Sequence, residues 1–213
     1  MNIVKIDEEK YILDNKQVNI KTNNNKLILE CYNDDLIVLD NYIKELDIIL
    51  SDNCYVNLYI NNKLDSINST INIYVNNNTS FNLYSGFKTK DNSNIKIINN
   101  IKGNNNNSNI KLRGIAKDNL LNIDVSLKVI EKTKDNILVE DIKGITDGGK
   151  IMIKPIMEID THEVIANHFV TIGNIDKNML FYLTSKGISK RKAKSLILNG
   201  FLNTVKLEVN KNE

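Results

Sequence analysis

Two histidines and two cysteines are the residues of this 213-residue chain whose types most readily bind a metal. His162 and His168 are six residues apart, so an unbroken strand through both would place their imidazoles on one face. Neutral imidazole is a good iron or zinc ligand, although a histidine on a strand more commonly has a structural, hydrogen-bonded role. Cys31 and Cys54 lack the Cys-x-x-Cys and Cys-x-His spacings of cluster or zinc sites. We therefore predict that both cysteines pack in the core as small apolar side chains.

No catalytic constellation is recognisable in the sequence. A nucleophile–base pair, a phosphate-binding loop and a carboxylate pair with a chemical rationale are all missing, and Asp147-Gly148-Gly149 is typical of a turn. The 28 Lys and Arg residues nearly balance the 26 Asp and Glu residues, which excludes a protein that binds polyanions over its whole surface. No apolar run approaches the about 18 residues of a membrane span, and the N-terminus does not resemble a secretory signal peptide. These features predict a non-enzymatic protein of the reducing cytoplasm.

A basic stretch near the C-terminus contains Lys190, Arg191, Lys192 and Lys194. The simplest interpretation is a solvated helix face. The surrounding sequence SKGISKRKAKSLI also resembles a helix–hairpin–helix, in which two glycines allow the backbone to approach DNA phosphates, but Ser189 stands where the second glycine belongs. The third interpretation is a pair of helices that docks a protein partner. Composition alone leaves these three alternatives open.

The first 160 residues alternate apolar and polar side chains with the period of two that is typical of half-buried strands. Such stretches recur about every ten to fifteen residues without a convincing helical stripe between them, which predicts an all-β sandwich, barrel or solenoid. The predicted inward faces are Cys54, Val56, Leu58 and Ile60; Ile71, Ile73 and Val75; and Ile123, Val125, Leu127 and Val129.

Asparagine accounts for 37 residues, and its clusters fall between the apolar stretches. An AT-rich genome would enrich asparagine without a structural reason, but asparagine also tolerates left-handed backbone angles and forms turns. Nine glycines and one proline are few for the hairpin turns of a sandwich or barrel, so the composition favours a β-solenoid. We predict turns at Asn23–Asn25, Asn61-Asn62, Asn76–Asn78, Asn99-Asn100 and Asn104–Asn107.

The periodicity becomes helical near Asp176. Asp176 is a suitable N-cap for a short helix, Gly187 fits its C-terminal end, and Ser189 fits the N-cap of a second helix. The apolar residues of that second helix are Ala193, Leu196, Ile197 and Leu198, and we expect Gly200 and Phe201 to follow it. The sequence thus predicts a β body over residues 1–175 and a two-helix appendage over residues 176–213.

A series of short elements extends from the end of the predicted β body into the helices. They are, in order, Pro155, Met157-Glu158-Ile159, Glu163-Val164, His168, Gly173, Phe181-Tyr182-Leu183, Lys186-Gly187-Ile188, Ala193 and Gly200-Phe201. Their order and spacing resemble the C-terminal core of the SufB/SufD family of iron–sulfur cluster assembly proteins. The resemblance is specific over about residues 110–205, whereas residues 1–110 share with the family only a general pattern of short β-strands.

The resemblance implies a right-handed parallel β-helix with a small C-terminal helical appendage. It also implies a non-catalytic, cytoplasmic scaffold subunit of the SUF machinery. Two SufB/SufD-type subunits pair there through their β-helices, and each docks an ABC-type ATPase, SufC, through its C-terminal helices. Homodimer and heterodimer both remain open. The implied docking residues are Leu180, Phe181, Tyr182, Leu183, Gly187, Ile188, Ala193 and Phe201.

The resemblance also implies candidate ligands for a transient iron–sulfur cluster at the subunit interface, which this chain would not hold alone. The cysteine that SufB contributes falls on or near Glu140, and the histidine is His168, followed by Phe169 instead of an acidic residue. Without that thiolate the chain is more similar to SufD, and it is shorter than usual family members. The alternatives are a nucleic-acid-binding module that uses residues 190–194, and a purely structural or adhesive β-helix.

Overall fold

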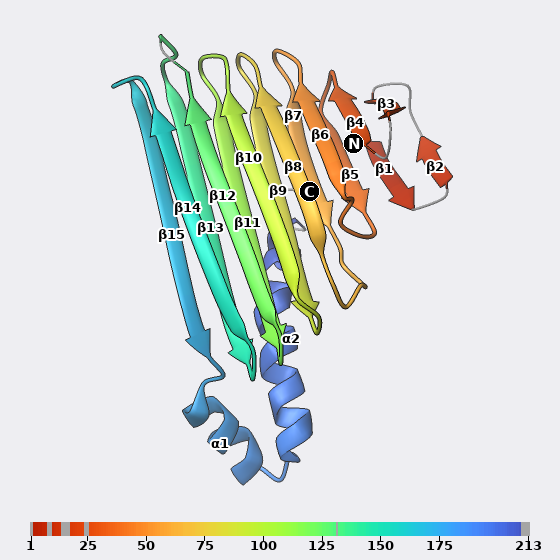
Figure 1. Ribbon diagram of the computed structural model, residues 1–213, viewed down its shortest axis with the longest axis vertical. Helices are drawn as coiled ribbons and strands as arrows, with labels where there is room; N and C mark the ends of the chain where they lie inside the picture. The colour runs from red at the N-terminus through yellow and green to blue at the C-terminus, as the bar shows by residue number, and fades with distance from the viewer. Residues whose placement is uncertain (1, 8–9, 14–17, 24–25, 131, 210–213) are drawn as a thin grey trace.

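The computed structural model describes residues 2–7, 10–13, 18–23, 26–130 and 132–209. Within these residues the strands form two sheets, which face each other and between which the chain alternates (Figure 1). Sheet A contains, in spatial order, β15 (Val164–Asn174), β13 (Asn136–Asp147), β11 (Asn107–Lys117), β9 (Ser80–Thr89), β7 (Tyr55–Ile60), β5 (Asp35–Leu39), β1 (Asn2–Asp7) and β2 (Lys10–Leu13). Sheet B contains β14 (Lys150–Ile159), β12 (Leu120–Val129), β10 (Ser93–Ile101), β8 (Asn68–Val75), β6 (Glu45–Leu50), β4 (Lys26–Cys31) and β3 (Val18–Asn23).

Strands of successive coils pair in parallel and in register. Asn94 on β10, for example, lies between Asn68 on β8 and Asn122 on β12, one coil before and one coil after it. Only the pairs β1–β2 and β3–β4 are antiparallel among the described strands, and both lie at the N-terminal end of the stack. The predicted parallel β-solenoid is therefore confirmed, with reversed strands at one end.

The core lies between the two sheets and contains the predicted inward faces. All eleven residues of those faces are buried, and so is Cys31. A fully buried Leu, Ile or Val side chain contributes about 1.5–3 kcal/mol to folding, so the regular burial of one side chain in two accounts for the stability of the stack. The prediction that both cysteines pack in the core is confirmed, since Cys31 and Cys54 are free thiols within it.

The asparagine clusters mark most of the corners, as predicted. Asn61-Asn62, Asn76–Asn78 and residues 104–106 connect strands. Asn53, Asn78 and Asn105 occupy the same corner of successive coils with φ of 60°, 55° and 56°. Their amides form a ladder, in which the Nδ2 of each residue donates to the Oδ1 of the residue one coil below, at 3.0 and 3.1 Å.

The turn predicted at Asn99-Asn100 is wrong, because both residues lie inside β10. Their amides are hydrogen-bonded within the stack, where Asn99 Nδ2 donates to Ser108 Oγ (2.9 Å) and Asn100 Nδ2 to the Ile73 carbonyl (3.1 Å). These bonds pair the amide N–H groups of two side chains that would otherwise favour a turn, although Asn99 Oδ1 has no partner among the described residues. The turn predicted at Asn23–Asn25 falls largely outside the described residues.

Two helices follow β15: the first extends beyond the ends of the strands, and the second runs back along sheet A (Figure 1). Helix α1 spans Lys177–Ser185, and Asp176 caps it by accepting from the backbone N–H groups of Asn178 (2.8 Å) and Met179 (3.2 Å). Gly187, with φ of +84°, ends this segment as predicted. No described helix is long and apolar enough to cross a membrane.

Helix α2 spans Lys190–Val209 and is longer than predicted. Gly200 and Phe201 were expected to follow this helix, but they lie inside it. A glycine within a helix costs about 1 kcal/mol relative to alanine. Burial on the outer face of sheet A offsets this cost, because Val205 is fully buried in a cluster with Tyr59 and Tyr84. The tertiary contact therefore overrides the local stop signal.

Candidate functional site

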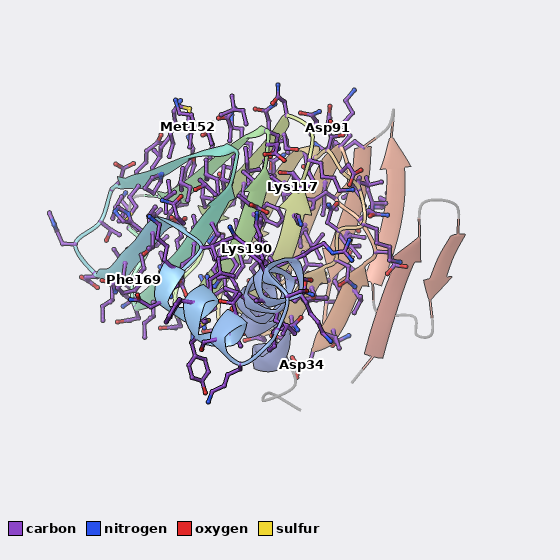
Figure 2. The ribbon with its side chains drawn as sticks, turned by 90° about the horizontal axis from the view of Figure 1, so that it is seen from below. Asp34, Asp91, Lys117, Met152, Phe169 and Lys190 are labelled. Atoms are coloured by element: carbon purple, nitrogen blue, oxygen red, sulfur yellow. The ribbon has the colours of Figure 1, made fainter. Side chains whose placement is uncertain are left out.

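The last coil, formed by β14 and β15, leaves one end of the solenoid open. Strand β15 pairs with β13 on one edge, and no described strand pairs with its other edge. Among the inward side chains of this coil Ile151 is buried, whereas Val170 and Ile172 are exposed and most of the others are only partly buried, in contrast to those of the preceding coils. Figure 2 shows Met152 and Phe169, which is 57% exposed, at this end of the molecule. The exposed apolar residues of the coil are Met152, Ile156, Ile165, Phe169, Val170 and Ile172.

Glu140 and His168 are brought together at this open end. The register of β13 and β15 pairs the two residues directly, so their side chains lie on the same face of sheet A. Glu140 faces the interior like its neighbours Leu138 and Ile142, and it is only 1% exposed. His168 is in the uncovered last coil and is exposed. A buried carboxyl group therefore lies beside an imidazole that solvent can reach.

The environment of Glu140 keeps its carboxyl group neutral near pH 7. Both carboxyl oxygens lack a hydrogen-bond partner among the described residues. Burial raises the pKa of Glu140 to about 8, because the charged form loses its hydration without gaining a counter-ion. A buried ionisable group with a strongly shifted pKa at an accessible end of the fold is a candidate functional group.

His162 does not join this pair. Strand β15 begins at Val164, so the strand does not extend back to His162, which is exposed in the connection after β14. The two histidines therefore do not share one strand face, as an unbroken strand would have required. The acidic residue that precedes β15 is Glu163, whose backbone carbonyl accepts from the N–H of Asp135 (2.9 Å) and holds the connection to the previous coil.

The donors at the open end do not fit an iron–sulfur cluster held by this chain alone. Such clusters are held mainly by cysteine thiolates. Cys31 lies on β4 and Cys54 immediately before β7, several coils away and buried. No group of three or more His, Cys, Asp or Glu side chains within the described residues is arranged to hold a metal ion. Glu140 and His168 supply one oxygen and one nitrogen donor.

A second candidate site is the tip formed by α1 and the start of α2, which we call the helical tip (residues 177–192). Phe181 is 73% exposed and Tyr182 is 59% exposed, and Lys186 Nζ lies 5.7 Å from the centre of the Tyr182 ring. Leu180, Leu183 and Ile188 are partly buried, whereas Gly187 is exposed. The exposed cations Lys190, Arg191 and Lys192 form the start of α2, after the turn that follows α1, and Figure 2 labels Lys190 on this helix.

Two residues of the predicted docking set have other positions. Ala193 is fully buried, so its side chain is not available to a partner. Phe201 lies within α2 and is partly buried. Met179 and Leu196 are highly exposed but were not among the predicted docking residues.

Helix α2 connects the helical tip to the β body. It packs on β9 and β11, and Lys194 forms an ion pair with the buried carboxylate of Asp147 at the end of β13. A Cβ atom on Gly86 of β9 would lie 2.9 Å from the Leu202 carbonyl oxygen, which shows how closely the helix approaches the sheet. The strand that carries Glu140 is thus in contact with the helix that carries the tip.

Comparison with known proteins identifies relatives of this fold and site. The family model for the SUF system FeS cluster assembly SufBD core domain matches residues 55–201, more than half of the chain. The Bacillus subtilis iron–sulfur cluster assembly protein SufD is 44% identical over 48 residues, which are 22% of this chain and 11% of SufD.

Two further relatives give similar matches. An iron–sulfur cluster assembly SufBD family protein of Mycobacterium bovis is 37% identical over 62 residues, 29% of this chain and 16% of that protein. Escherichia coli SufD is 31% identical over 71 residues, 33% of this chain and 15% of SufD. The matched segments thus span only 11% to 16% of these relatives' own lengths. Since the family model covers most of the solenoid, α1 and the first part of α2, the chain belongs to the SufBD family of the SUF iron–sulfur cluster assembly system.

Proposed function

We propose that the chain is a non-catalytic, cytoplasmic scaffold subunit of a SUF-type iron–sulfur cluster assembly complex. In this proposal the helical tip docks a SufC-like ABC ATPase, which performs the nucleotide hydrolysis. The observation that carries the proposal is the exposure of Phe181 and Tyr182 on α1, together with the exposed cations Lys190, Arg191 and Lys192 at the start of α2. Aromatic residues and arginine dominate the binding energy of protein interfaces, which favours a protein partner at this tip.

The contacts of α2 support a mechanical role for the scaffold. The Lys194–Asp147 ion pair near the start of α2 and the burial of Val205 toward its end attach the helix to sheet A. A displacement of the tip by the ATPase would therefore act on β13, which carries Glu140, instead of bending a free linker. The scaffold would couple the ATPase to the open end.

The open end is the surface proposed for pairing with a second SufB/SufD-type subunit. A sheet edge without a partner exposes unpaired backbone groups, and proteins commonly cover such edges. Solenoids also need terminal coils with polar outer faces to stay soluble, whereas Ile165, Phe169 and Ile172 are exposed on β15. In the pair, the Glu140–His168 site would lie at the subunit interface, where a transient iron–sulfur cluster would be handled as cargo.

Co-purification tests the docking proposal. The double variant Phe181→Ala/Tyr182→Ala should lose co-purification with a SufC-like ATPase while its circular dichroism stays that of the β body. Ile130→Ala is a matched control, since it removes an exposed apolar side chain from the body. Undiminished co-purification of the double variant would contradict the docking assignment.

The competing proposal is a nucleic-acid-binding module, favoured by the exposure of Lys190, Arg191 and Lys192. Phosphate contacts make affinity fall steeply with salt. A titration with duplex DNA at increasing salt therefore separates the two functions. Absence of binding at low salt eliminates the nucleic-acid proposal.

A further inference from the structure

A cavity lies between α2 and the β body, at a distance from both candidate sites described above. Its volume is about 480 Å³, within the range of about 300–1,000 Å³ that is typical of small-molecule sites. The connection after β7 (residues 61–65), part of β9 and the middle of α2 line it. Because β11 and β13 separate β9 from β15, the cavity is distinct from the open end of the solenoid.

The lining of this cavity has an excess of positive charge. Three lysines, Lys63, Lys88 and Lys90, line it together with two aspartates. Lys90 pairs with Asp65 at 2.7 Å, and Lys63 with Asp40 at 3.8 Å. Lys88 on β9 is partly buried and forms no ion pair with a described residue. An ammonium group that is partly withdrawn from water and has no counter-ion attracts an anion.

Asparagine amides supply most of the other polar groups of the cavity. Asn61 and Asn62 line it from the connection after β7, and Asn199 and Asn203 line it from α2. Asn62 Nδ2 donates to the Leu64 carbonyl (2.7 Å), but the buried Asn62 Oδ1 has no partner among the described residues. A hydroxyl group inserted at this wall would donate to that oxygen. Amides both donate and accept hydrogen bonds, so this lining suits a ligand with hydroxyl groups.

The size, charge and amide lining of the cavity together limit its ligand. We propose that the cavity binds a small hydroxylated organic anion, whose phosphate or carboxylate group pairs with Lys88. Both groups accept charge-assisted hydrogen bonds from lysine. Since α2 and the β body line the same cavity, the bound anion bridges them and adds to the contacts that hold α2 on sheet A. This inference goes beyond the proposed function and does not depend on it.

The test is isothermal titration calorimetry of the purified full chain at low ionic strength with ribose phosphate, ribonate and ribose, which share a carbon skeleton. We expect ribose phosphate, ribonate or both to bind and ribose not to bind, and the comparison identifies the anionic group. Lys88→Met should weaken binding by about tenfold or more, because it removes a charge-assisted hydrogen bond and keeps the length of the side chain. Lys154→Met is the matched control, since Lys154 is an exposed lysine on β14 of the other sheet, and its affinity should match the wild type.

A second variant tests the α2 side of the cavity. Asn203 is exposed, so Asn203→Asp places a negative charge at the cavity without repacking the core, and it should also weaken anion binding. Amide hydrogen exchange should become slower in α2 when the anion is bound. The absence of binding of either anion to the wild type, equally tight binding of ribose, or full affinity in both Lys88→Met and Asn203→Asp would overturn the site. Unchanged exchange in α2 on saturation with the anion would overturn the bridge between helix and body.

Discussion

Glu140 should make the stability of this protein depend on pH in an unusual direction. Burial raises its pKa from 4.5 to about 8 in the folded chain. A group with a raised folded-state pKa contributes its full stability below the unfolded-state pKa, and this contribution is lost as the pH rises toward the folded-state value. Stability should therefore decrease between about pH 4.5 and pH 8. Each pH unit within that window lowers the free energy of unfolding by about 1.4 kcal/mol, so the protein loses about 2–3 kcal/mol of stability between pH 5 and pH 7.

The variant Glu140→Gln isolates this contribution, because it removes the ionisable proton and keeps the shape of the side chain. Urea denaturation of both proteins at pH 5, 6, 7 and 8, with a chelator present, gives the free energy of unfolding at each pH. All other titrating groups are common to both, so the difference between variant and wild type should increase by about 2–3 kcal/mol from pH 5 to pH 7 and level off above pH 8. Parallel pH profiles would refute the assignment of a neutral, buried carboxyl group to Glu140.

Three other predictions concern the helix contact, the donor set and the open edge. Gly86→Ala should destabilise the fold by about 1–3 kcal/mol, since the new methyl group meets the backbone of α2. Gly200→Ala should instead stabilise it by up to about 1 kcal/mol, because no neighbouring atom lies within 4 Å of the new methyl group and alanine favours a helix. Urea denaturation measures the free energy of unfolding of both variants, and equal effects would contradict the close approach of α2 to β9. Glu140→Cys should gain an iron–sulfur charge-transfer band on reconstitution, because it supplies the thiolate that clusters prefer, and an unchanged spectrum would count against the site. Phe169→Asp should shift any dimer toward monomer in sedimentation velocity, and an unaltered dimer would place the pairing surface elsewhere.

The strands and their inward faces were predictable because their signal is local. The alternation of Cys54, Val56, Leu58 and Ile60 with other residues determines which side of β7 faces the core between the sheets, although Asn57 and Tyr59 on the opposite side are buried as well. The N-cap at Asp176 and the helix end at Gly187 are local signals of the same kind.

Contacts between coils were not predictable from local pattern. Asn78 hydrogen-bonds to Asn53, a residue one coil earlier, and the sequence has no strict repeat that reveals this spacing. Glu140 likewise lacks a hydrogen-bond partner because of which residues surround it in the stack, and its neighbour in register on the next coil is His168. Resemblance to a family pointed to both residues, but only the fold shows that one is buried and the other exposed.

The helices show how tertiary packing changes a local prediction. Gly200 was expected to lie beyond the second helix, yet α2 continues through it because Val205 is buried on sheet A. Ala193 was expected at a docking surface, yet it is buried. The side of a helix that meets the body depends on the direction in which the helix crosses the sheet, and its own sequence does not contain that direction.

Amide hydrogen exchange of the chain with and without a SufC-like ATPase tests the central claim most directly. The docking proposal predicts slower exchange in the helical tip when the ATPase is added, with β12 in the middle of the solenoid unchanged. Slower exchange along β15 with none in the helical tip would contradict it.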